Sequence, residues 1–136
     1  MNTFKIMIMA ALLGIFTKTA FSQEQKSQEY LEKAIVAYEH SLDFKMPSVV
    51  ESAIYNVIVM KKFYPDEDYS DLVDTINDLV ADGKTPTLRY KAQLASLYFE
   101  YPQLFKNIEF KNTKEKPEFY FKQISEKLVE NSLALK

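Results

Sequence analysis

The sequence has no cysteine, and it contains a single histidine, a single arginine and two glycines. Without cysteine there are no disulfides, no thiol nucleophile and no thiolate metal site. The single histidine, His40, cannot build a multi-histidine zinc site. Ser41 follows it directly, but neighbouring helix residues point about 100° apart, so we expect a surface histidine and no catalytic triad. The scarcity of glycine disfavours turn-rich sandwiches and barrels and favours helices.

The first 22 residues have the pattern of an export signal. Lys5 provides a positive charge, residues 6–16 are apolar, and Ala20-Phe21-Ser22 places small residues before a cut at Gln23. A membrane anchor needs ~20 apolar residues, and Lys18 interrupts this run too early. We therefore predict a cleaved signal peptide, residues 23–136 as a single domain without a membrane span, and a periplasmic or secreted location. No cysteine follows the cut, which excludes a lipid-anchored lipoprotein.

The charge balance after this cut is mildly acidic. Residues 1–22 contain two lysines and no acid, which leaves 15 Lys and Arg against 19 Asp and Glu, a net charge of −4. Nucleic-acid binding requires a clustered basic face, whereas these lysines are scattered. We therefore expect no nucleic-acid partner.

A short phrase occurs twice, with every matched position 39 residues apart. Its first copy lies between Asp43 and Ala53, and its second lies between Asp82 and Ala92. Each copy contains Lys, Pro and an apolar residue in the same register, and a helical apolar pattern that ends in Tyr-Pro follows each copy. A period near 40 with two helices per unit is typical of helical-repeat proteins. The sequence therefore predicts an all-α fold of about five main helices.

Helix boundaries follow from caps and prolines. The first helix is expected from Glu29 to near Phe44, and Ser48 with Glu51 forms a predicted capping box for the second. The second helix is apolar over more than half its circumference, which predicts burial from two sides. The third is expected to be capped by Asp68 or Ser70.

The later helices carry clearer signals. Gly83 is expected to end the third helix in the left-handed conformation. Thr85 is expected to cap the fourth helix, with Pro86 at its first position. A single turn is expected near Leu104 before Pro117 opens the last helix.

The second copy of the phrase resembles a known family. Pro86-Thr87-Leu88-Arg89, with Ala92 and Ala95, is similar to the second helix of a HEAT-type repeat, over about the 60 residues from Asp43 to Pro102. The resemblance implies antiparallel helix pairs stacked as a short α-solenoid that binds proteins or peptides. It also implies a structural bridge between Arg89 and Asp82 or Asp43. The chain as a whole resembles small exported helical proteins of bacteria.

The fourth helix also provides the candidate binding site. Aromatic residues and arginine dominate interface energetics, so its basic and aromatic residues form a possible contact patch. This predicted patch consists of Lys84, Arg89, Tyr90, Lys91, Tyr98 and Tyr101. The alternative is a solvated helix face with a structural arginine. Gly-rich phosphate loops, nucleophile elbows and paired metal-ligand histidines are absent, so we predict no cofactor, no metal site and no catalytic residue.

Two alternatives depend on the acidic residues. Residues 66–71 resemble the opening of a calcium loop, but Asp71 replaces the required Gly and Asn77 replaces the bidentate Glu. The second hypothesis is a periplasmic carrier of calcium or of a small ligand, with this acidic loop or an apolar groove between helices as its site, and the high content of Phe and Tyr favours it. The third is an enzyme that uses Asp71, Asp74 and Asp78, which share one helix face and are expected to be its wet side. The leading hypothesis is an exported, non-enzymatic module that binds a protein or peptide.

Overall fold

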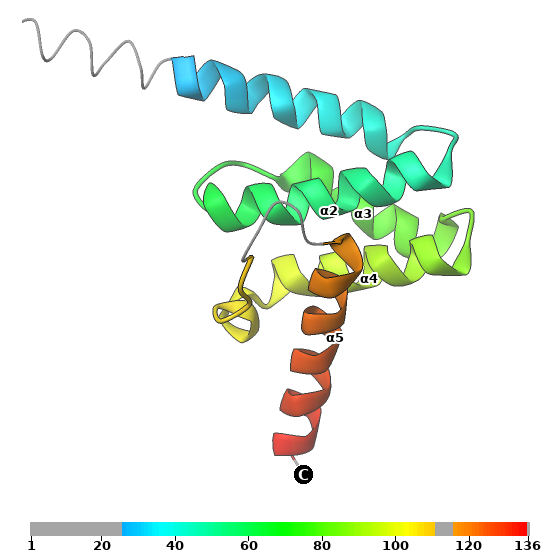
Figure 1. Ribbon diagram of the computed structural model, residues 1–136. Coiled ribbons are helices and arrows are strands. Elements are labelled where there is room, and N and C mark those ends of the chain that lie inside the picture. Colours follow the sequence, from blue (N-terminus) through cyan, green and yellow to red (C-terminus); the bar gives the residue numbers. More distant parts are fainter. Residues whose placement is uncertain (1–25, 111–115, 136) are drawn as a thin grey trace, which may run out of the picture. The chain divides into compact units, whose positions relative to one another are not determined.

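The computed structural model describes residues 26–110 and 116–135, which are mostly helical and contain no strand (Figure 1). The first helix covers residues 26–42. It is followed by α2 (Pro47–Phe63), α3 (Ser70–Asp82), α4 (Pro86–Glu100), the 3₁₀ helix η1 (Pro102–Phe105) and α5 (Pro117–Ala134). The predicted all-α class is therefore confirmed. The signal peptide predicted for residues 1–22 lies outside the described residues.

The chain divides into two compact units, Met1–Val36 and Ala37–Lys136. The described part of the first unit is helical, and it contains an exposed ion pair of 2.7 Å between Lys33 and Glu29. The helix that crosses the boundary ends at Leu42, two residues before the predicted end. None of the helices in the described ranges is both long and apolar enough to span a membrane.

The two copies of the repeated phrase occupy equivalent places in the second unit. Pro47 begins α2 and Pro86 begins α4. The two helices contact each other and run in the same direction (Figure 1). The Nζ of Lys84 donates to the carbonyl of Lys45 at 2.7 Å, and these are matched positions, 39 residues apart. The two copies of the repeat are therefore in contact, while the arrangement of antiparallel helix pairs as a short α-solenoid stays a prediction.

Helix α4 is central to the second unit, because it contacts α2, α3, η1 and α5. Ala92 and Ala95 on α4 are fully buried, and their small side chains let neighbouring helices approach closely. Helix α2 buries six apolar residues and contacts α4, whereas the burial from two sides stays a prediction. Its buried residues are Val50, Ala53, Ile54, Val57, Ile58 and Met60.

Some of the predicted helix caps are present and others are not. The Thr85 hydroxyl accepts a hydrogen bond from the Leu88 amide at 3.1 Å, and Pro86 is the first residue of α4, as predicted. The capping box of Ser48 and Glu51 is wrong: a cap at Ser48 would start α2 at Val49, but α2 begins two residues earlier, at Pro47, and no side chain caps it. Proline is favourable at the first helical position because it has no amide to leave unpaired and its φ is already helical.

The acidic loop before α3 also differs from the expectation. Tyr69 takes the cap position of α3, without a side-chain cap bond. The Asp68 carboxylate accepts hydrogen bonds from the amide of Ser70 at 3.0 Å and from its hydroxyl at 2.6 Å. These two bonds lower the pKa of Asp68, the hydroxyl more than the amide.

Gly83 follows α3, but the predicted left-handed conformation is wrong, because φ is −55°. Glycine is needed there for space. A Cβ would lie 2.7 Å from the carbonyl oxygen of Leu79 and 3.0 Å from Cγ of Arg89. The Arg89 guanidinium donates to the Gly83 carbonyl at 2.8 Å. The expected bridge from Arg89 to Asp82 or Asp43 is not among the ion pairs of the described residues. Arg89 instead links α4 to the end of α3 through its bond to Gly83.

Tyr69 links the end of α2 to α3 and α4. Its hydroxyl donates to the carbonyls of Tyr64 at 2.6 Å and Met60 at 3.1 Å, and its side chain is 4% exposed. Its ring lies 5.7 Å from that of Phe99. Burial, with a smaller contribution from Glu67, raises the pKa of Tyr69 to about 12.

Candidate functional site

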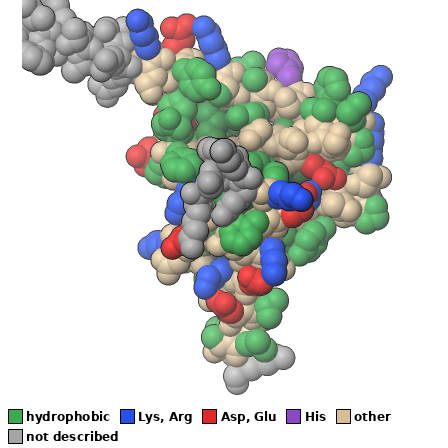
Figure 2. Space-filling view, viewed as in Figure 1, with side chains coloured by type: hydrophobic (Ala, Val, Ile, Leu, Met, Phe, Trp, Pro, Cys, Tyr) green, Lys and Arg blue, Asp and Glu red, His purple; other side chains and the backbone are tan. Residues whose placement is uncertain are grey.

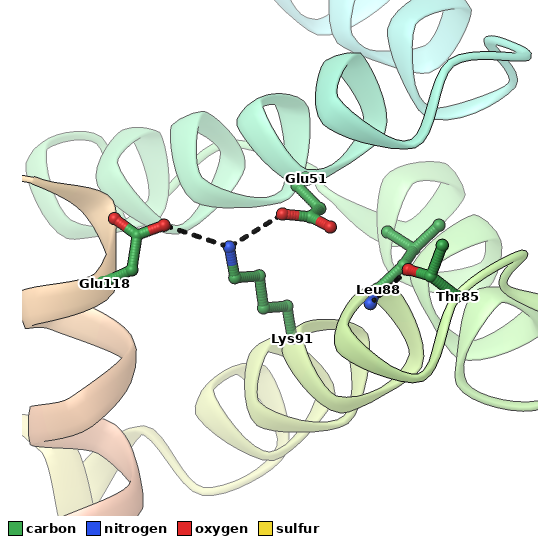
Figure 3. Close-up of polar contacts among 5 residues, drawn as sticks. All are labelled: Glu51, Thr85, Leu88, Lys91 and Glu118. Carbon is green, nitrogen blue, oxygen red and sulfur yellow. Dashed lines mark hydrogen bonds and ion pairs between the residues drawn. The ribbon is translucent and has the colours of Figure 1, made fainter.

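The most unusual polar group in the described chain is the buried side chain of Lys91 on α4. It reaches between α2 and α5, where its Nζ lies 2.8 Å from Glu51 and 3.4 Å from Glu118 (Figure 3). The same ammonium lies 5.4 Å from the ring centroid of Phe121, within cation–π range. Two carboxylates and an aromatic face therefore surround this lysine, which favours a structural role over a nucleophilic one.

Glu118 lies at the start of α5. A hydrogen bond from its own backbone N–H is the main cause that lowers the pKa of Glu118. Burial raises this pKa, and Lys91 lowers it further. The side chain is 67% exposed, whereas Glu51 is 23% exposed. The cluster is therefore more buried on the α2 side and more exposed to solvent on the α5 side.

A cleft of about 410 Å³ opens between α4 and α5 beside this cluster. The hydroxyl of Tyr90 on α4 donates to that of Ser125 on α5 at 3.1 Å, across the cleft. Tyr90 remains 53% exposed, whereas Phe121 is buried. The residues that line it are Thr87, Tyr90, Lys91, Glu118, Phe121, Lys122, Ser125 and Glu126. The cleft combines an aromatic wall with charged groups that already have partners.

The structure brings only part of the predicted patch to this cleft. Tyr90 and Lys91 line it, with Lys91 8% exposed in its base. Lys84 instead donates to the carbonyl of Lys45, just before α2, and Arg89 donates to the carbonyl of Gly83 at the α3–α4 turn.

The two remaining tyrosines of the predicted patch lie toward the other end of α4. Tyr98 is buried, and its ring stacks on that of Phe105 at 5.5 Å. Burial raises the pKa of Tyr98. Tyr101 caps the end of α4 and is 39% exposed. The six residues therefore do not form one continuous surface.

Sequence reasoning missed the contributions of α2 and α5 to this site. The sequence pattern assigns Glu51 to a helix cap. In the 39-residue register of the repeat, however, Glu51 matches Tyr90, the neighbour of Lys91 in the sequence. With α2 and α4 side by side, that register brings opposite charges together. Phe121 and Ser125 carried no comparable signal, because the 39-residue spacing of the repeat is not kept in α5.

The other candidate residues lie away from the cleft. His40 is exposed, as expected, and Ser41 donates to the carbonyl of Ala37 at 2.8 Å, not to the histidine. Asp71 and Asn77, at the key calcium-loop positions, are helical residues of α3. Asp74 and Asp78 are exposed on the same helix. In residues 26–110 and 116–135, no three His, Cys, Asp or Glu residues are grouped so that they could hold a metal ion.

Comparison with known proteins adds no relative to this description. No family model, no curated protein and no solved structure matches this chain. Function is therefore inferred from the residues around the α4–α5 cleft.

Proposed function

We propose that this chain is an exported, non-enzymatic binding module that engages a protein or peptide through its helical-repeat surface, at the cleft between α4 and α5. The observation that carries the proposal is the exposed ring of Tyr90 beside the buried ring of Phe121, in a cleft of about 410 Å³. Aromatic side chains at the edge of a pocket are typical anchors of protein interfaces.

The charges of the site support binding over catalysis. Lys91 is paired with two carboxylates, and Lys122 lies 3.7 Å from Glu126 in an exposed pair. Paired charges favour recognition of neutral, apolar groups, because an added charge would compete with an existing partner. An uncharged helix or peptide with an apolar anchor fits this pattern.

A photo-crosslinking amino acid in place of Tyr90 tests the proposal. The purified variant, added to the proteins of the compartment into which the chain is exported, should form adducts with a defined protein, identified by mass spectrometry. The matched control carries the same amino acid in place of Phe44, which is 56% exposed but lies outside the cleft. Equal, diffuse labelling from both positions would contradict a binding role for the cleft.

A small-ligand carrier is a second candidate, because the volume of the cleft lies in the ~300–1,000 Å³ range of ligand sites. Thermal unfolding measured with a panel of lipids, glycans and calcium distinguishes the two. A shift that the Tyr90→Ala variant loses would favour the carrier. An unchanged melting temperature throughout the panel would remove it.

A further inference from the structure

A second cleft lies at the end of α2, apart from the one between α4 and α5. Residues 62–63 of α2 and residues 106–110, which follow η1, line it, and we call it the α2 cleft. None of these residues lines the α4–α5 cleft. Its volume of about 620 Å³ lies within the ~300–1,000 Å³ range of small-molecule sites.

Buried and hydrogen-bonded groups hold the walls of the α2 cleft in place. Ile108, in the middle of the segment after η1, is buried. The side-chain amide of Gln123 on α5 donates to the carbonyl of Glu109 at 3.4 Å. The Nζ of Lys62 donates to the carbonyl of Lys106 at 3.3 Å, which joins the two walls. The cleft is therefore already formed without a ligand.

A row of aromatic rings leads from the core to this cleft. The rings of Tyr55 and Phe110 each lie against that of the buried Tyr120, with centroids 5.4 Å and 4.3 Å away. The ring of Phe63 lies 6.4 Å from that of Phe110 and is tilted from it by 57°. Phe63 ends the row and is 61% exposed. Aromatic rings attract one another at centroid distances of about 4.5–7 Å, so the exposed ring of Phe63 can take a further ring.

The charges of the α2 cleft favour an anion. Two lysines and one acid line it, and the acid, Glu109, already has an interaction partner. Neither Lys62 nor Lys106 has a carboxylate partner within residues 26–110 and 116–135. An ammonium group has three donors, and Lys62 uses one of them on a backbone carbonyl. Donors of both lysines therefore remain for a ligand.

The surroundings supply no broad field that would attract anions to the whole surface. Basic and acidic side chains are interleaved over the face drawn in Figure 2. The full sequence also has a net charge of −2. A preference for an anion must therefore come from the two lysines of the cleft.

We propose that the α2 cleft binds a small organic anion that carries an aromatic ring, of the class of aromatic carboxylates. The ring packs against Phe63 and Phe110, and the carboxylate accepts hydrogen bonds from Lys62 and Lys106. An inorganic anion would leave the aromatic rings exposed, and a neutral ring would leave both lysines without a counter-charge. This site is additional to the α4–α5 cleft and does not depend on the function proposed for it.

Isothermal titration of the purified protein with 2-naphthoate and with 2-naphthalenemethanol compares one ring system with and without its charge. Naphthoate should bind about tenfold more tightly than the alcohol, because each exposed ion pair contributes up to about fivefold. Octanoate, an anion without a ring, should also bind about tenfold more weakly than naphthoate. No binding of naphthoate at millimolar concentration, or equal affinity for naphthoate and either of the other compounds, would overturn the inference.

Lysine variants place the ligand in the α2 cleft. The double variant Lys62→Gln with Lys106→Gln should lose the preference for naphthoate and bind it about as weakly as the alcohol. The matched control is Lys26→Gln with Lys45→Gln, which removes two exposed lysines outside the cleft and should keep the preference. A double variant at Lys62 and Lys106 that still prefers naphthoate contradicts the arrangement.

Ring variants test the aromatic wall. Phe63→Leu keeps an apolar side chain without its ring and should weaken naphthoate binding several-fold, whereas Phe44→Leu, at an exposed position outside the cleft, should not. Circular dichroism checks that each variant is folded. Naphthoate binding that Tyr90→Ala abolishes would place the ligand in the α4–α5 cleft and overturn this inference. Failure of Tyr90 to crosslink to any protein would instead remove only the proposed function.

Discussion

Replacing Lys91 with methionine should destabilise the protein by leaving Glu51 without its partner. The side chain of Lys91 is 10% exposed, and its Nζ lies 2.8 Å from Glu51. Methionine keeps most of the lysine's volume and its contact with Phe121, so the loss is chiefly electrostatic. The substitution therefore measures the ion pair more than the packing.

The magnitude follows from the exposure of each partner. Breaking a fully buried pair costs about 3–5 kcal/mol, whereas an exposed pair contributes about 0.2–1 kcal/mol. Glu51 is 23% exposed, so water partly solvates it after the change, and we expect a loss of about 2 kcal/mol for Lys91→Met. Glu118 is 67% exposed, so Glu118→Gln should cost less than about 1 kcal/mol.

Urea unfolding, followed by circular dichroism, gives the free energies of unfolding. A loss of about 2 kcal/mol corresponds to a fall of about 10 °C in Tm for a domain of this size. The double variant Lys91→Met with Glu51→Leu should recover most of the loss, because no unpaired charge remains. The reasoning is refuted if Lys91→Met stays within about 0.5 kcal/mol of the wild type, the usual range for surface substitutions. It is also refuted if the double variant is no more stable than Lys91→Met.

Three further predictions concern stability. Thr85→Ala should lower the unfolding free energy by about 1 kcal/mol, because α4 loses its cap, and Thr85→Ser should retain the wild-type value in the same urea titration. Gly83→Ala should cost about 1–2 kcal/mol, since the added methyl lies 2.7 Å from the Leu79 carbonyl; unchanged stability would contradict the close approach. The folded-state pKa of Tyr69 is raised to about 12, so the stability that it contributes is complete below its ordinary pKa of about 10 and is lost as the pH rises toward 12. Thermal melts from pH 9 to 12 should show a shallower decline for Tyr69→Phe than for the wild type; parallel declines would argue against this assignment.

The helix starts were the most predictable part of the fold. Pro86 and Pro117 begin helices as expected, and Thr85 caps α4, because proline and threonine act within one helical turn. The repeated phrase also anticipated that Pro47 and Pro86 begin equivalent helices. The same local signals failed at Ser48, because α2 begins two residues before the start that Ser48 would cap.

The site was only partly predictable. Tyr90 and Lys91 were selected from the sequence, but their surroundings depend on Glu51, 40 residues from Lys91, and on Glu118, 27 residues from it. Nothing within one turn of Lys91 specifies that it is buried. Its burial follows from the packing of α2 and α5 around its side chain, which lies between them.

The sequence by itself determined the class of fold, the starts of α4 and α5 and the equivalence of two segments, because each depends on the nearest few residues or on a repeated pattern. The tertiary structure decided which charges pair, why Gly83 has no room for a side chain, and that a cleft lies between α4 and α5. These features arise where helices distant in sequence meet, and the angle at which they meet is set by the packing of the whole core.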